Sequence, residues 1–302
     1  MNLENSILYS VVVPVYNSEH SLESLFSRIE STFKKLSLKF EIIFVNDCSE
    51  DKSLEVLKQI HYKNKSSNII IIDLYKNFGQ QNALMCGFNH CSGKFVITID
   101  DDLQNPPEEL DKLILKINEG YDVVYGSYEK KKDKFFKNIG SILFRKINHR
   151  IFNIKNNLIF TSFRIIKADI VNQLLLNKTS YPYISGMLVQ CTSNIANVNV
   201  KHEHRSSGKS NYSFIKLVYI SLNLIINHSS ILLNMLSYFG LFISLAALSS
   251  GLWYIFEKII NDGTVPGWTT IVVLLSFYNA LVLALLFIIG VYISRLLKET
   301  SY

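Results

Sequence analysis

Three consecutive aspartates at positions 100–102 are the residues of this sequence best suited to chemistry. The stretch 97–109 reads ITIDDDLQNPPEE, so the carboxylates follow an apolar run that predicts a buried strand. Asp100 and Asp102 are separated by one residue and could therefore bind one divalent cation. Mg²⁺ and Mn²⁺ take oxygen ligands of this kind and share them with substrate phosphates. Acid/base chemistry and helix capping are the other uses of such a cluster.

The residues after the aspartates predict the start of a helix. Pro106 and Pro107 suit its first positions, and Glu108 and Glu109 in its first turn are favourable for the helix dipole. We therefore expect no functional role for these two glutamates.

Apolar runs and helical patterns alternate over the first 200 residues, and we expect them to position the aspartates. The runs are too continuously apolar for strands with one exposed face, so they predict an α/β domain with a mainly parallel, Rossmann-like sheet. Ligands bind such sheets beyond the carboxyl ends of the strands, where the polar residues concentrate here. Strands are expected at 9–15, 40–45, 68–74, 94–99 and 121–125, and helices at 18–36, 51–62, 80–90 and 108–119.

The C-terminal third predicts a transmembrane hairpin. Segments 231–256 and 268–294 contain no charged residue, and each is long enough to cross a bilayer as a helix. A buried core hairpin is the alternative. The basic flanks and the lack of a signal peptide predict that the N-terminal domain and both termini lie in the cytoplasm. The expected parts are a cytoplasmic domain at 1–205, a juxtamembrane helix at 206–228 and the hairpin with a short tail at 229–302.

The charge of the chain favours an anionic partner. The formal net charge is +6, which fits a membrane surface, a nucleotide or a phosphate, whereas no nucleic-acid-binding motif is present. Segment 128–155 is rich in both basic and apolar residues, which predicts an interfacial helix at a bilayer; an ordinary packing helix is the alternative. The four cysteines have no metal-binding or disulfide spacing.

An ordered set of motifs carries a resemblance that covers essentially the whole chain. VVVPVYNSE, VNDCSED, KNFGQQNAL, DDDLQNPPE and HRSSGKSNY appear in this order before the two apolar segments. The sequence thereby resembles the polyprenyl-phosphate branch of the GT-A family 2 glycosyltransferases, which includes dolichyl-phosphate mannose synthase and bactoprenol-phosphate glucosyltransferases. The D-x-D-L-Q-x-P-P-E element is specific to that branch.

The resemblance implies a role for each matching residue. Asp100 and Asp102 match the metal-binding aspartates, and Asp101 fills the variable middle position. Strand alternation predicts that Asp101 points away from that pair. Asp100 and Asp101 are also counted among the expected nucleotide-sugar-binding residues. Arg164 and Arg205 match catalytic positions. The remaining nucleotide-sugar-binding residues are Pro14, Tyr16, Glu19, Asp47, Ser49, Gly79 and Gln80. The expected lipid-phosphate-binding residues are Lys132, Lys134, Arg145, Arg205, Ser210 and Tyr212.

The sequence departs from the family pattern at two positions. Relatives commonly have an aspartate, the proposed catalytic base, where this chain has Ser162. Relatives often have an arginine at the position of Tyr128. A phosphate monoester acceptor has a second pKa of about 6, so its oxygen is already ionised at neutral pH and a general base is dispensable.

The expected activity is therefore metal-dependent transfer of one hexose from a nucleotide sugar, UDP-hexose before GDP-hexose, to a polyprenyl phosphate. Mg²⁺ or Mn²⁺ is the expected cofactor, inversion the expected stereochemistry, and the bacterial cytoplasmic membrane the expected location. The resemblance also implies a homo-oligomer, a tetramer in some relatives. The alternatives are a glycosyltransferase that uses a glycolipid hydroxyl and a catalytically silent, membrane-anchored nucleotide-sugar-binding protein.

Overall fold

The computed structural model describes residues 8–128, 158–203 and 267–300, together with positions 239, 242 and 249. The chain divides into two compact units, Met1–Leu217 and Val218–Tyr302. The predicted nucleotide-sugar and metal residues all belong to the first unit.

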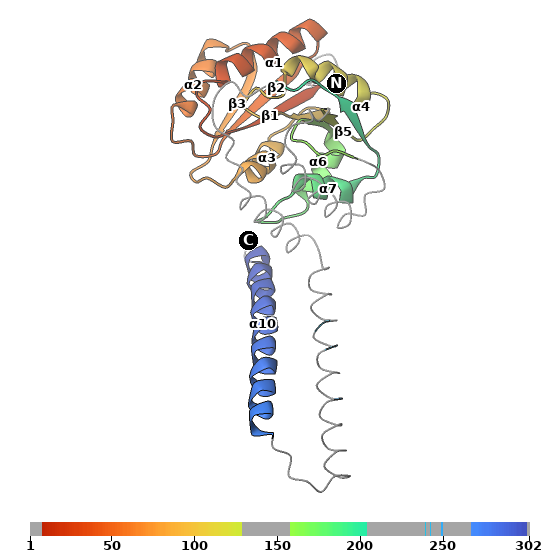
Figure 1. Cartoon of the computed structure of the whole chain (residues 1–302). Helices are drawn as coiled ribbons and strands as arrows, with labels where there is room; N and C mark the ends of the chain where they lie inside the picture. The colour runs from red at the N-terminus through yellow and green to blue at the C-terminus, as the bar shows by residue number, and fades with distance from the viewer. Residues whose placement is uncertain are drawn as a thin grey trace. The chain divides into compact units, whose positions relative to one another are not determined.

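The first unit contains a seven-stranded mixed sheet with the strand order β3-β2-β1-β4-β6-β5-β7 (Figure 1). Strands β3, β2, β1 and β4 pair with one another in parallel, and so do β5 and β7. Strand β6 is antiparallel to both of its neighbours, β4 and β5. Every residue of β1 is buried, as its continuous apolar run requires. The strands are β1 (Tyr9–Val15), β2 (Phe40–Asn46), β3 (Asn68–Asp73), β4 (Phe95–Thr98), β5 (Val123–Ser127), β6 (Arg164–Lys167) and β7 (Ile195–Asn199).

Helices cover both faces of the sheet and produce two separate apolar cores. The core on one face includes residues of α1, α2 and α4, and the core on the other includes residues of α3, α6 and α7 (Figure 1). In α1, Leu22, Leu25, Phe26, Ile29 and Phe33 are buried at helical spacing. The helices are α1 (Leu22–Leu36), α2 (Ser53–Lys63), α3 (Gln80–Phe88), the 3₁₀ turn η2 (Pro107–Glu109), α4 (Leu110–Ile117), α6 (Ala168–Leu175) and α7 (Ile184–Cys191).

The α/β prediction with a mainly parallel sheet is confirmed. All five predicted strands are present, and their ends differ from the prediction by at most two residues. The predicted helices are also present, although 18–36 begins only at Leu22 and 108–119 is the turn η2 followed by α4. Strands β6 and β7 and helices α6 and α7 were not predicted.

The antiparallel strand β6 determines which segments meet at the edge of the sheet. Thr98, the last residue of β4, pairs with Arg164, the first residue of β6. The hydroxyl of Thr98 also donates a hydrogen bond to the carbonyl oxygen of Ser162. The segment before β6 therefore lies beside the aspartates that follow β4.

The described part of the second unit is mainly α10 (Trp268–Thr300). Of the predicted segment 231–256, only positions 239, 242 and 249 are among the described residues. Where the structure describes the chain, none of its helices is both long enough and apolar enough to cross a membrane.

Candidate functional site

The carboxylate of Asp100 is held by residues from two other segments. Gln80, at the start of α3, donates from Nε2 to Oδ1 of Asp100 over 2.6 Å, and the hydroxyl of Ser162 donates to Oδ2. Burial raises the pKa of Asp100, and the charge of Asp102 raises it further. The hydrogen bond from Ser162 and the charge of Arg164 act in the opposite direction. The structure thus places three residues predicted from the sequence, Gln80, Asp100 and Ser162, in direct contact.

Asp101 faces the loop after β1. Its Oδ2 accepts hydrogen bonds from the backbone N–H of Tyr16 at 3.0 Å and from the hydroxyl of Ser18 at 2.5 Å. The hydroxyl of Ser21 donates to the Asp101 carbonyl oxygen at 2.5 Å. Burial raises the pKa of Asp101 to about 6, although the bonds from Ser18 and Tyr16 partly oppose the rise. Asp101 therefore fixes a loop that we expect to contact the nucleotide.

A tight turn follows the aspartates. Oδ1 of Asp102 accepts a hydrogen bond from the N–H of Gln104 at 3.1 Å, and Leu103 between them has a φ of 60°. A left-handed conformation is unusual for leucine, so the surrounding contacts hold the turn against its local preference. The turn directs the chain from the three aspartates toward Pro106 and η2.

Asp47 and Gly79, both predicted to contact the nucleotide, contact each other. The two carboxylate oxygens of Asp47 accept the backbone N–H groups of Phe78 and Gly79, each at 2.8 Å. Gly79 has a φ of 87°, which favours glycine, and it directly precedes α3. Asp47 is buried, with only 3% of the residue exposed. Its carboxylate therefore anchors the loop that leads into α3 and Gln80.

The loops after β1 and β2 are joined by side-chain to backbone hydrogen bonds. The N–H of Glu19 donates to Asp51, and the N–H of Lys52 donates back to the carboxylate of Glu19. In the same way, the N–H of Asn17 donates to the hydroxyl of Ser49 at 3.1 Å. Two predicted nucleotide-sugar residues, Glu19 and Ser49, therefore shape the site by connecting its loops.

Arg164, the first residue of β6, is buried rather than exposed at the site. It is 2% exposed, donates from Nη1 to the hydroxyl of Ser185 at 3.1 Å and lies 5.8 Å from the centre of the Tyr125 ring. Its charge lowers the pKa of Asp100. From this position Arg164 acts on the site electrostatically.

Two aromatic side chains near the aspartates were not predicted as site residues. The rings of Tyr128 and His202 are 4.2 Å apart between centroids. Burial raises the pKa of Tyr128, and the charges of Asp100 and Asp102 raise it further. The only sequence signal was the replacement of the family's usual arginine by Tyr128.

The remaining predicted residues fall into two groups. Pro14 is a buried residue of β1, and Tyr16, which directly follows this strand, is 46% exposed. The lipid-phosphate residues lie outside the described residues, so their roles stay predictions: Lys132, Lys134, Arg145, Arg205, Ser210 and Tyr212.

Comparison with known proteins now gives the family. Residues 10–175, which span β1 to α6 and include all three aspartates and Ser162, match the family described as Glycosyl transferase family 2. The chain belongs to this family. This glycosyltransferase therefore combines the family's α/β sheet with the carboxylate edge described above.

Relatives of this glycosyltransferase match it over almost their whole length. An uncharacterized glycosyltransferase of Synechocystis sp. is 32% identical over 98% of this chain and 93% of its own. An undecaprenyl-phosphate 4-deoxy-4-formamido-L-arabinose transferase of Shewanella sediminis is 30% identical over 98% of this chain and 90% of its own. The resemblance to the polyprenyl-phosphate branch is thus confirmed at the level of homology.

Solved structures share the fold of this glycosyltransferase. Glucosyl-3-phosphoglycerate synthase from Mycobacterium tuberculosis, crystallised with Mn²⁺, UDP and phosphoglyceric acid, aligns with a TM-score of 0.51 at 19% identity. The alignment covers 73% of this chain and 76% of that one. It supports a GT-A-like α/β fold.

The donor set of this glycosyltransferase fits a divalent cation shared with a phosphate ligand. Within the ranges that the structure describes, no three His, Cys, Asp or Glu side chains form a group that could hold a metal by themselves. Asp100 and Asp102 nevertheless supply carboxylate oxygens, and burial together with the charge of Asp102 raises the pKa of Asp100. Mg²⁺ and Mn²⁺ are commonly held by one or two carboxylates together with substrate phosphates.

Proposed function

We propose that this protein transfers a single hexose from a nucleotide sugar, with UDP preferred to GDP, to a polyprenyl phosphate. The observation that carries the proposal is the contact between Ser162 and Asp100, at the place where the family usually has a second carboxylate. A serine hydroxyl that is already donating to a carboxylate is a poor general base. An acceptor whose oxygen is ionised at neutral pH does not need one.

The roles of the described residues follow from their contacts. Asp100 and Asp102 would hold Mg²⁺ or Mn²⁺, which would stabilise the nucleoside diphosphate as it leaves. Gln80 and Ser162 orient Asp100, and Asp47 holds the loop from which Gln80 extends. Attack by the phosphate oxygen opposite the departing diphosphate would invert the anomeric centre. The buried charge of Arg164 limits the repulsion between the anionic acceptor and the carboxylates.

We further propose that the protein is anchored in the bacterial cytoplasmic membrane, with its catalytic unit on the cytoplasmic side. This part of the proposal rests on the sequence pattern, namely the charge-free segments 231–256 and 268–294 and their basic flanks. Homologues named for transfer of sugars to undecaprenyl phosphate support the lipid acceptor. Assembly into a homo-oligomer is part of the same proposal by resemblance.

The test is a transfer assay with two matched acceptors. Full-length protein in lipid nanodiscs is incubated with radiolabelled UDP- or GDP-hexoses, Mn²⁺ or Mg²⁺, and either polyprenyl phosphate or the unphosphorylated polyprenol. Label should enter the mild-acid-labile lipid only with the phosphate, and the rate should fall below about pH 6 as the acceptor becomes protonated. Transfer to the polyprenol at a similar rate would overturn the choice of acceptor.

A pair of carboxylate variants controls the assay. Asp102→Ala should abolish transfer, while Asp111→Asn on α4, whose carboxylate bonds only its neighbour's N–H among the described contacts, should retain it. Nucleotide binding without transfer to any acceptor in the wild type would favour the silent binding protein. Full activity of Asp102→Ala would contradict the metal-site assignment.

A further inference from the structure

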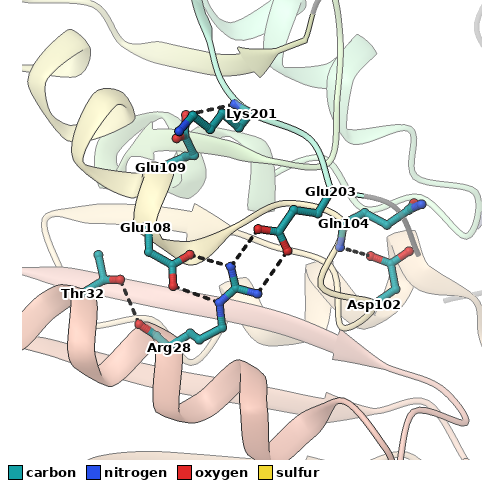
Figure 2. A network of polar contacts seen from close by, with 8 residues as sticks. All are labelled: Arg28, Thr32, Asp102, Gln104, Glu108, Glu109, Lys201 and Glu203. Atoms are coloured by element: carbon teal, nitrogen blue, oxygen red, sulfur yellow. Dashed lines mark hydrogen bonds and ion pairs between the residues drawn. The ribbon is translucent and has the colours of Figure 1, made fainter. Parts of the chain in front are cut away.

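A short segment after β7 lies along the loop that carries Asp102. The N–H of Glu203 donates to the carbonyl oxygen of Gln104 at 2.9 Å. The N–H of Gln104 in turn donates to Oδ1 of Asp102 (Figure 2). The N–H of Lys201 donates to Oε2 of Glu109 at 2.9 Å. Segment 201–203 is thus attached both to the metal-binding loop and to η2.

Arg28 of α1 binds two glutamates that are far apart in the sequence. Its Nε and Nη2 donate to the two carboxylate oxygens of Glu108 at 2.9 and 2.7 Å. Its Nη1 and Nη2 also reach the carboxylate of Glu203 at 3.4 and 3.3 Å (Figure 2). The planar guanidinium is suited to this double contact, which a lysine could not reproduce.

The burial of the three side chains shows that Arg28 is the centre of the cluster. The Arg28 side chain is 26% exposed, whereas those of Glu108 and Glu203 are 55% and 52% exposed. The hydroxyl of Thr32 donates to the Arg28 carbonyl oxygen one helical turn away. Arg28 therefore connects α1 to two more exposed side chains, Glu108 of η2 and Glu203 of the segment after β7.

The contacts form a continuous path from Asp102 through Gln104 and Glu203 to Arg28. After Glu203 the chain continues directly into Arg205 and the R-x-x-G-x-S-x-Y stretch, which the sequence predicts to bind lipid phosphate. We propose that Arg28 is a positioning residue that holds segment 201–203 against the Asp102 loop, and that it so fixes where the chain leaves this loop toward the predicted lipid-phosphate residues. The choice of lipid phosphate as the affected substrate rests on the proposed function.

We call Arg28 together with Glu108 and Glu203 the clamp. An ordinary surface ion pair would behave differently from this clamp. Exposed pairs contribute little to stability, so removing one should leave every kinetic constant nearly unchanged. A structural role in α1 would instead lower stability and impair binding of both substrates together. A positioning role predicts weaker binding of the lipid phosphate, with binding of the nucleotide sugar unchanged.

The test compares Arg28→Gln with a control and a charge exchange in full-length protein in nanodiscs. Arg28→Gln should raise the KM for polyprenyl phosphate roughly five- to tenfold, with kcat and the KM for the nucleotide sugar within about twofold of wild type. The control is Lys63→Gln, which removes an exposed ion pair between Lys63 of α2 and Glu23 of α1. Lys63 is remote in sequence from the Asp102 loop and from segment 201–203. The double variant Arg28→Glu/Glu203→Arg keeps one cation and two carboxylates in the cluster and the ion pair between positions 28 and 203, so it should restore part of the affinity.

Two kinetic results would overturn the proposal. One is an unchanged KM for polyprenyl phosphate in Arg28→Gln. The other is a parallel loss of affinity for both substrates that the charge exchange does not restore.

A second measurement separates this proposal from the proposed function. Hydrogen exchange at the amides of Gln104 and Glu203 should become faster in Arg28→Gln and stay unchanged in Lys63→Gln. Should the wild type transfer no sugar to lipid phosphate, the proposed function fails while faster exchange still supports the clamp. Equal exchange in all variants would overturn the clamp whatever the activity.

Discussion

Replacement of Asp47 by asparagine should destabilise the protein as well as weaken nucleotide binding. Both carboxylate oxygens of Asp47 accept a backbone N–H at 2.8 Å, and the residue is 3% exposed. Asparagine keeps one acceptor and turns an NH₂ group toward the other N–H, so one charge-assisted bond is lost and a buried donor is left unpaired. Such bonds are worth about 1.5–3 kcal/mol, and we expect a net loss of ~2–3 kcal/mol.

This loss should be visible in a thermal melt. For a unit of this size, ~2–3 kcal/mol corresponds to a decrease in Tm of about 5–10 °C. The matched control is Asp73→Asn at the end of the neighbouring strand β3, because Asp73 is exposed and accepts the side-chain amide of Asn46 at 2.7 Å. UDP affinity should be measured by titration well below both melting temperatures.

The two readouts distinguish an anchor from a simple ligand contact. If Asp47 anchors the loop, Tm and UDP affinity should fall together in Asp47→Asn. A large loss of UDP affinity with the Tm of wild type would refute the reasoning, because the carboxylate would then be free to bind the nucleotide. A Tm decrease no larger than that of Asp73→Asn would refute it as well.

Three further predictions concern the aspartates and the packing of the sheet. The pKa of Asp101 is raised to about 6, so the folded state keeps a proton that the unfolded chain loses near pH 4. The stability of the metal-free protein should therefore fall as the pH rises from about 4 to 6. In thermal melts of Asp101→Asn, this dependence of Tm on pH should be lost. Ser162→Asp places a second carboxylate against Asp100, so at pH 7.5 and without metal its Tm should be lower than that of Ser162→Asn. Addition of Mn²⁺ should reduce this difference in Tm. Equal Tm values for the two variants would contradict the contact between Ser162 and Asp100. Gly93→Ala would place a Cβ 2.8 Å from the backbone nitrogen of Ser10. The midpoint of urea unfolding should therefore fall by an amount equivalent to about 2 kcal/mol or more. An unchanged midpoint would contradict the close packing of Gly93 against β1.

The strands that the sequence predicted are those whose burial leaves a local signature. Parallel strands covered on both faces are continuous apolar runs, as in YSVVVPV, and can be identified without knowledge of their neighbours. The missed strand β6 has only four residues, RIIK, and begins and ends with a basic residue. Its pairing with β4 depends on partners more than sixty positions away, so no local pattern predicts it.

The location of the site was predictable, but several of its contacts were not. The position of the aspartates after a buried strand predicted the edge at which Asp100 meets Gln80 and Ser162. The expectation that Glu108 and Glu109 serve only to begin a helix was incomplete. Glu108 binds Arg28 and Glu109 accepts the N–H of Lys201, and these partners are 80 and 92 residues away.

The hydrogen bonds between the loops after β1 and β2 affect the thermodynamics of ligand binding. The chain itself ties these loops together, through hydrogen bonds of Asn17, Glu19, Ser49 and Asp51. A ligand entering between them would not have to order them, so little conformational entropy is lost on that side of the site. Nucleotide association should accordingly be a fast, single-step process with a small backbone displacement in these loops.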